Sequence, residues 1–393
     1  MNWRQSNNIS LKKIRSFVFL LFLLFIVDNA LIAQYSVNRK PQDEHLIVST
    51  MDLIYNFQFE EAQKQITEVK KRFPNHPIYH FLAAMACYWE MVPIAIENPR
   101  YKTYEYHLLK TLELSEAMLQ NESTTQEATY YMMAANSSLI VSYLKAKDYG
   151  KSIAEARKTY AFMKEGFDWG EKYPDFNFSS GLYYFYAEQY PETHPIIQPL
   201  MWFFTKGDRE KGIALLKKSA QNSVFSKTES DYFLAHVYLK YYNQPNESLK
   251  YAKKLIEKYP NNYFYISRYT EALVLLKKYV EAKPFAEKLL KNQIDYAQIS
   301  GNLFLAMIEL ANNSNAAAKR RFEVAEKLSL TSKKQTADYL AFVYLGLGKI
   351  YEKENNPKKA EKYFDKLQEI GEYKIHNVEL EAYKKRKKAA KGK

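Results

Sequence analysis

The sequence predicts an all-α protein in which helical hairpins stack one on the next to form a solenoid. Gly (11 residues) and Pro (13 residues) are scarce in the 393-residue chain, which favours helices joined by short connections. Apolar residues recur at helical spacing along the body of the chain. Two stretches that begin at Glu229 and Tyr263, 34 residues apart, carry small and apolar residues at matching offsets without a gap. A fixed period of this length indicates a repeat architecture.

Residues 1–33 predict a secretory signal peptide. A basic stretch, residues 12–15, precedes an apolar run at residues 17–27, and Ala33 closes a suitable cleavage site. The apolar run is too short to span a bilayer comfortably. We therefore expect export to a periplasm or to the cell envelope, with an uncleaved membrane anchor as the less favoured alternative.

Residues 34–165 predict the first hairpins of the array. The first unit closes at Pro74, because proline lacks an N–H group and clashes with the preceding helical turn. The second helix of the next unit is expected at about 104–119, and a third unit at about 124–165. These residues form the predicted N-terminal part of the array.

Residues 166–222 depart from the repeat pattern. We expect an aromatic helix at 181–189, a Pro-rich connection, and one further hairpin turn into a helix that begins near Arg209. Aromatic residues bring large contact area to interfaces and to cores alike. Those of this segment are therefore candidates for partner binding, although packing between the two half-arrays is the favoured interpretation: Tyr183, Tyr184, Tyr186, Trp202, Phe203 and Phe204.

Residues 223–372 predict the most regular part of the array, and Pro260 closes one of its units. Residues 373–393 are expected to form a capping helix, beginning near Asn377, and a basic tail. In the last full unit, small residues stand where helix axes approach and aromatic residues fill the hairpin. These positions are Gly348, Ala360, Tyr351 and Phe364.

The spacing of these residues resembles the tetratricopeptide repeat, whose period is about 34 residues. The resemblance implies an α-solenoid of about seven to eight hairpins in a right-handed superhelix. It also implies a scaffold for protein–protein interaction, which holds a peptide or a partner helix on its concave face, and together with the predicted signal peptide it indicates an exported bacterial protein. The residues expected to bind the partner on that face are His236, Lys240, Arg268 and Tyr269.

The formal charge of +13 is concentrated at the two ends of the chain. Residues 1–33 carry a net +3 and residues 384–393 carry a net +7, which leaves +3 for the body between them. No nucleic-acid partner is expected from so balanced a body. The tail Lys384–Lys393 is either the solvated end of the capping helix or an attraction site for anionic lipid or cell-wall polymer. An envelope-associated module that uses this tail and the aromatic loop is therefore the alternative function.

Motifs for catalysis are missing from the sequence. There is no GxGxxG, GxxxxGK[ST] or GxSxG pattern, and Cys87 lies in an apolar stretch typical of a core. His76 and His80 have a spacing that can suit zinc, but His76 precedes Pro77 and is expected outside the helix. We expect no enzyme, cofactor or metal site; an enzyme or a small-ligand-binding protein is the third alternative.

Overall fold

The computed structural model describes residues 41–92, 96–332 and 336–391, so the predicted signal peptide lies outside the described residues. Seventeen α-helices and two 3-10 helices make up the described part, in which no β-strand occurs. None of these helices combines the length and the apolar character needed to cross a membrane. The chain divides between Asp231 and Tyr232 into two compact units, an N-terminal unit and a C-terminal unit.

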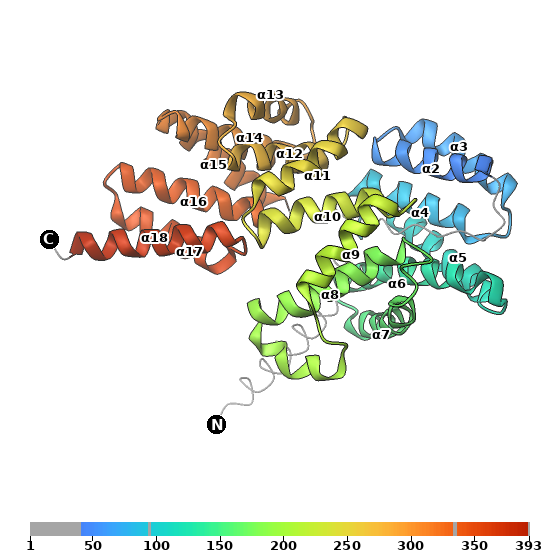
Figure 1. The fold of residues 1–393 in the computed structure, drawn as a ribbon. Coiled ribbons are helices and arrows are strands. Elements are labelled where there is room, and N and C mark those ends of the chain that lie inside the picture. Colours follow the sequence, from blue (N-terminus) through green and yellow to red (C-terminus); the bar gives the residue numbers. More distant parts are fainter. Residues whose placement is uncertain (1–40, 93–95, 333–335, 392–393) are drawn as a thin grey trace. The chain divides into compact units, whose positions relative to one another are not determined.

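The N-terminal unit contains four hairpins whose paired helices run antiparallel (Figure 1). A 3-10 helix, η1 (Glu122–Thr124), precedes α6, and a longer one, η2 (Pro195–Phe203), separates α8 from α9. The paired helices are α2 (Pro41–Tyr55) with α3 (Phe59–Arg72), α4 (Pro77–Met91) with α5 (Tyr101–Met118), α6 (Thr125–Lys145) with α7 (Tyr149–Gly166), and α8 (Phe176–Thr193) with α9 (Arg209–Asn222).

The C-terminal unit contains four more hairpins and a final helix, α18 (Lys374–Lys391); the division between the units falls within α10. The eight hairpins of the described residues confirm the predicted all-α solenoid. The pairs are α10 (Lys227–Lys240) with α11 (Pro245–Lys258), α12 (Tyr263–Leu275) with α13 (Tyr279–Leu290), α14 (Asp295–Ala311) with α15 (Asn315–Thr331), and α16 (Ala337–Lys353) with α17 (Pro357–Ile370).

Most of the hairpin turns use one left-handed residue. In six of the eight described hairpins the residue at this position has a φ of 53° to 61°. In five of these six turns the next residue donates its N–H to a carbonyl five residues earlier, as Asn356 does to Tyr351 at 2.9 Å; after Asn243, Gln244 donates to Tyr238, six residues earlier. This hydrogen bond closes the helix end in a Schellman-type cap. Asparagine tolerates the left-handed conformation well and fills three of the positions: Asn243, Asn313 and Asn355.

The glycines of the last hairpin make room for aromatic rings. A Cβ on Gly348 would lie 3.0 Å from the ring of Phe364, so this glycine makes room for the phenylalanine and not for Ala360. The tighter site is Gly346, where a Cβ would lie 2.2 Å from the ring of Phe322. Ala360 is buried, and Tyr351 stacks on Tyr363 with ring centroids 5.6 Å apart. Pro74 and Pro260 each follow the end of a helix.

The segment 166–222 forms a hairpin of the same type as the others. Helix α8 extends beyond the predicted 181–189 in both directions, and it packs closely on α9. Glycines stand at the crossing, because a Cβ on Gly212 would lie 2.6 Å from the backbone nitrogen of Phe185. What distinguishes this segment is therefore the insertion of η2 between two ordinary hairpin helices.

Helix α18 begins at Lys374, three residues before the predicted start, and continues through most of the basic tail. Part of the tail's charge is compensated by acidic residues of α16 and α17. Arg386 pairs with Glu352 at 2.8 Å, and Lys387 pairs with Glu361. The described part of the tail is thus a helix with ion pairs along it.

Candidate functional site

The ten residues predicted to bind a partner lie in different surroundings. Three tyrosines of α8 are buried, Trp202 and Phe203 are almost wholly exposed, and Phe204 and Tyr269 are half-buried against other aromatic rings. Lys240 and Arg268 belong to a polar cluster, which His236 adjoins. These surroundings decide what each residue can do.

The tyrosines of α8 pack inside the N-terminal unit. Tyr183 is fully buried, donates a hydrogen bond from its hydroxyl to the carbonyl of Thr205 at 2.6 Å, and lies against the ring of Phe167. Tyr184 is also buried and carries the ammonium group of Lys211 over its ring at 3.7 Å. Tyr186 is 3% exposed. The burial of these three tyrosines favours packing over partner binding for this part of the aromatic segment.

Trp202 and Phe203, at the end of η2, are the opposite case. Trp202 is 92% exposed and Phe203 is 82% exposed, which makes them two adjacent large aromatic side chains almost wholly in solvent. We call this pair the aromatic tip. Scattered single apolar residues are normal on protein surfaces, whereas clustered ones mark interaction sites.

The residues that follow the aromatic tip are firmly held by α7 and α8. The ring of Phe204 lies edge-on to Tyr160 with centroids 5.0 Å apart, and the N–H of Thr205 donates to the Tyr160 hydroxyl at 2.9 Å. The N–H of Asp208 donates to the carbonyl of Tyr184 at 2.9 Å. The aromatic tip is therefore exposed even though the residues that follow it are fixed against α7 and α8.

Glycine and arginine complete this base. A Cβ on Gly207 would lie 2.2 Å from the backbone nitrogen of Glu188, so only glycine fits where the chain crosses α8. Arg209 then reaches back to the same helix and pairs with Glu188 at 3.0 Å and with Glu192 at 2.7 Å. Both ends of the η2 segment are thereby tied to each other through charged side chains.

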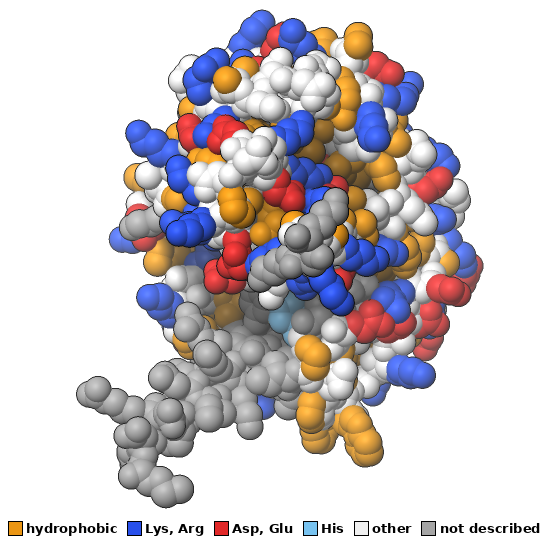
Figure 2. Space-filling model, turned by 90° about the vertical axis from the view of Figure 1, so that its left-hand side faces the viewer, with side chains coloured by type: hydrophobic (Ala, Val, Ile, Leu, Met, Phe, Trp, Pro, Cys, Tyr) orange, Lys and Arg blue, Asp and Glu red, His pale blue; other side chains and the backbone are white. Residues whose placement is uncertain are grey.

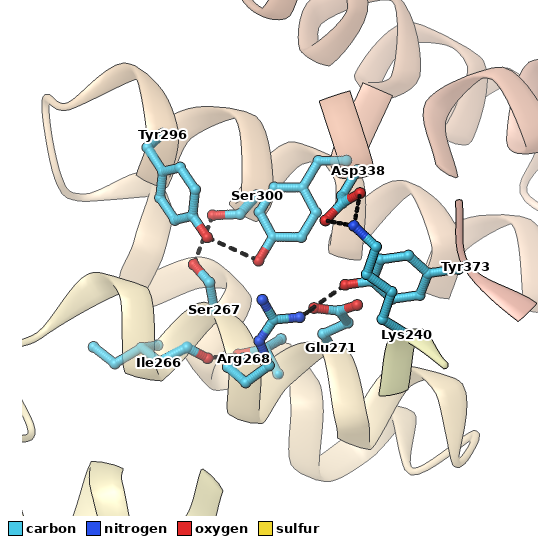
Figure 3. A network of polar contacts seen from close by, with 11 residues as sticks. Lys240, Ile266, Ser267, Arg268, Glu271, Tyr296, Ser300, Asp338 and Tyr373 are labelled. Carbon is cyan, nitrogen blue, oxygen red and sulfur yellow. Dashed lines mark hydrogen bonds and ion pairs between the residues drawn. The ribbon is translucent and has the colours of Figure 1, made fainter. Parts of the chain in front are cut away.

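The inner helices of the C-terminal unit contain a polar network, which Figure 3 draws. The ammonium group of Lys240 lies 3.2 Å from Asp338 and 2.7 Å from Glu372. The guanidinium of Arg268 lies 2.7 Å from Glu271 and donates to the hydroxyl of Tyr373 at 2.8 Å (Figure 3). We call these residues, together with Tyr296, Tyr339, Ser267 and Ser300, the polar network.

Hydroxyl groups extend the polar network along the same helices. The hydroxyl of Tyr296 donates to that of Tyr339 at 3.1 Å, and Ser267 and Ser300 are hydrogen-bonded at 2.9 Å (Figure 3). Lys240 is 8% exposed and Arg268 is 6% exposed. Buried charges require such partners, because an unpaired charge loses its hydration without compensation.

Burial and neighbouring charges shift the ionisation of this region. Burial opposes the charge of Arg268, but Tyr373 and Glu271 outweigh it and raise the pKa of the guanidinium well above its ordinary value. Burial also lowers the pKa of His236 well below its ordinary value, and the charges of Arg268 and Lys240 lower it further. Arg268 is therefore charged and His236 neutral at neutral pH.

The polar network joins helices that are distant in sequence. Lys240 of α10 and Asp338 of α16 are 98 residues apart, and Arg268 of α12 and Tyr373 before α18 are 105 residues apart. Two of the residues predicted to hold a peptide are thus engaged by other residues of the same unit. A third, Tyr269, is half-buried against the ring of Phe285 at 5.0 Å.

The partners of Lys240 and Arg268 were missed from the sequence. Glu271 could have been found, because it follows Arg268 by three residues and so lies on the same helix face. Asp338, Glu372 and Tyr373 carry no local signal, since Asp338 belongs to the distant helix α16 and the other two lie in the connection between α17 and α18. Only the folded array brings them to the first two residues.

The histidines and the cysteine that were weighed for chemistry have structural surroundings. His76 caps α4, its Nδ1 accepting from the N–H of Ile78 at 3.1 Å, while the ring of His80 faces His107. In the described ranges, no group of three or more His, Cys, Asp or Glu side chains is placed to hold a metal ion. Cys87 is buried, and burial raises the pKa of its thiol to about 11.

Helical hairpins, left-handed turn residues and small residues at helix crossings recur along the described part of the chain. The chain is an α-solenoid of tetratricopeptide-like hairpins. No protein-family model matches its sequence, and no curated protein does either.

Solved structures with a similar course include the human IFIT1 dimer with PPP-AAAA. It is 12% identical and has a TM-score of 0.42, and the match covers 93% of this chain and 91% of that one. Another is the tetratricopeptide-repeat domain of P58(IPK). It is 13% identical with a TM-score of 0.27, and the match covers 90% of this chain and 100% of that one. These values are too low to carry a functional argument.

Proposed function

We propose that this chain is an exported binding scaffold whose docking element is the aromatic tip. The observation that carries the proposal is the exposure of Trp202 and Phe203, at 92% and 82%. A large aromatic side chain left in water forfeits the free energy that its burial would release, about 25 cal/mol for each Å² of apolar surface. Two adjacent ones on a held base favour a role in binding.

The firm base supports the same role. Binding costs conformational entropy when the contacting side chains and loops must first be ordered. Here Phe204 and Thr205 are already fixed against Tyr160, and Arg209 ties the segment to α8. A pre-ordered tip loses less entropy on docking than a free loop would.

The inner face of the C-terminal unit is the less favoured docking site. Lys240 and Arg268 were expected to hold a peptide there, but their charges are compensated within the polar network. A partner at Arg268 would have to replace an ion pair in which both side chains are buried, and a partner at Lys240 would have to replace its contacts with Asp338 and Glu372. Such replacement is costly, because it leaves Asp338 or Glu271 without its cation.

The charge of the body favours an apolar contact over a polyanion. Residues 34–383 carry a net +3 only, and Asp and Glu side chains are interspersed among the Lys and Arg side chains of the face drawn in Figure 2. A nucleic-acid site would need a gathered basic surface to contact phosphates. The expectation that no nucleic acid is bound therefore remains part of the proposal.

The proposal is tested by capture from an envelope extract with the chain from Gln34 onward, which contains every described element. We expect the wild-type chain to retain material that W202S/F203S does not. Val280→Ser is the matched control, since Val280 is 90% exposed but lies on α13 in the other unit. Equal retention by all three chains would refute the proposal. Retention that disappears after nuclease treatment would show that nucleic acid is the partner.

A further inference from the structure

We infer that the aromatic tip docks on a lipid bilayer and enters its interfacial region. The inference rests on the proposed function, which requires only that the tip binds, and it names the partner. It follows from the size of the tip, from the lack of charged residues in its own segment, and from the way its backbone is closed.

The tip is too small to serve as a specific protein interface by itself. Two large aromatic side chains offer about 300–500 Å² between them. A stable protein–protein interface buries about 800 Å² on each partner. Shallow insertion into a bilayer needs no such area, because the apolar face of an interfacial element enters only about 5–10 Å.

The segment that carries the tip has no charged side chain to desolvate. Residues 193–205 contain no Asp, Glu, Lys or Arg, and the first charge that follows is the exposed Lys206. Charged groups resist transfer into the membrane, whereas Trp is enriched at the membrane–water interface. A cation directly behind the tip would lie at the level of the lipid headgroups, where anionic lipid attracts it.

The backbone of the segment suits the same surroundings. Residues Pro195–Phe203 form a 3-10 helix, and the N–H of Phe204 closes it by donating to the carbonyl of Met201 at 3.1 Å. Backbone groups that enter an apolar layer must be hydrogen-bonded within the protein. Pro195 and Pro199 have no N–H to satisfy. The segment therefore brings few unpaired donors to the layer.

The test measures the binding of the chain from Gln34 onward to sedimenting vesicles of phosphatidylcholine, with and without one quarter phosphatidylglycerol. Starting at Gln34 removes the apolar run at 17–27, which could itself bind lipid. We expect W202S/F203S to bind at least about tenfold more weakly than wild type, because its inserting apolar surface is gone. Val280→Ser should bind as wild type does.

Two further variants separate the tip from the basic tail. Lys385→Gln with Lys388→Gln removes two exposed cations of α18, and we expect it to bind phosphatidylcholine vesicles as wild type does, even in about 0.5 M salt. Trp202→Phe should keep binding but lose most of the quenching of tryptophan fluorescence by brominated lipid. The other two described tryptophans, Trp89 and Trp169, are not highly exposed and serve as the background signal.

The inference is overturned if wild type does not sediment with vesicles or if W202S/F203S binds equally well. It is also overturned if binding collapses in salt or in the lysine variant, which would assign it to the tail. If wild type does not bind vesicles but W202S/F203S still loses capture from the extract, the partner is a protein and the proposed function stands. If W202S/F203S keeps both vesicle binding and capture from the extract, both proposals are refuted.

Discussion

Lys240 and Arg268 lie inside the C-terminal unit, whereas Trp202 and Phe203 lie on the surface of the N-terminal unit. Charged residues are seldom fully buried in proteins, and large aromatic residues are seldom almost fully exposed. The polar network compensates Lys240 with Asp338 and Glu372, which are distant in sequence, and Arg268 with Glu271 of the same helix, at 2.7 to 3.2 Å. The aromatic tip shows no such compensation: both of its side chains remain in solvent.

This difference indicates that the polar network and the aromatic tip have different roles. A buried ion pair resists the loss of either member, because the remaining charge would stay in the interior unpaired. An exposed aromatic residue can be removed with little effect on folding, because it buries almost nothing. We therefore expect stability to depend on the polar network and binding to depend on the aromatic tip.

The largest effect is expected from Arg268→Ala, which leaves Glu271 buried without its cation. The free energy of unfolding should fall by about 3–5 kcal/mol, measured by urea denaturation. The double variant R268M/E271L removes both charges and should recover most of this loss. A cost below about 1 kcal/mol for Arg268→Ala would show that the network does not stabilise the unit.

An intermediate effect is expected from acid, through His376 at the start of α18. This side chain is fully buried against Phe342, and burial lowers its pKa to about 4 from an ordinary 6.5. A depressed pKa means that the neutral ring is favoured in the folded state. Its contribution is thus complete above pH 6.5 and is lost as the pH falls towards 4.

Between pH 7.5 and pH 4.5 this loss should amount to about 2–3 kcal/mol of unfolding free energy. His376→Phe keeps an aromatic ring against Phe342 but cannot take up a proton, so it should lose that part of the pH dependence. The comparison of urea midpoints at the two pH values checks this. Identical pH profiles for both chains would show that His376 does not sense acid.

The smallest effect on stability is expected from W202S/F203S. The free energy of unfolding should stay within about 0.5 kcal/mol of wild type, as is usual for surface substitutions. Thermal unfolding followed by circular dichroism measures this. A drop of several degrees in the melting temperature would restore the packing interpretation for the whole aromatic segment, and it would remove the contrast with the polar network.

Much of the fold could be predicted because its signals are local. Pro74 and Pro260 end units through a missing N–H group, and Gly348 leaves room for an aromatic residue of the next helix. Such signals lie within one hairpin of about 34 residues. The ends of α8 and the start of α18 were placed less well. Asp175 stands directly before α8, but its carboxylate accepts from the N–H groups of Phe225 and Ser226 instead of capping the helix, and buried residues extend both helices.

By itself the sequence determined the repeat, the helix order and the positions of the small residues, since each depends on neighbours three to about thirty residues away. It could not separate Tyr183 from Trp202, because both are aromatic residues in one aromatic segment. Only the tertiary structure buried the first beneath Thr205 and left the second in solvent. Likewise, Lys240 and Asp338 are 98 residues apart, and an ion pair at that separation exists only after the hairpins have stacked.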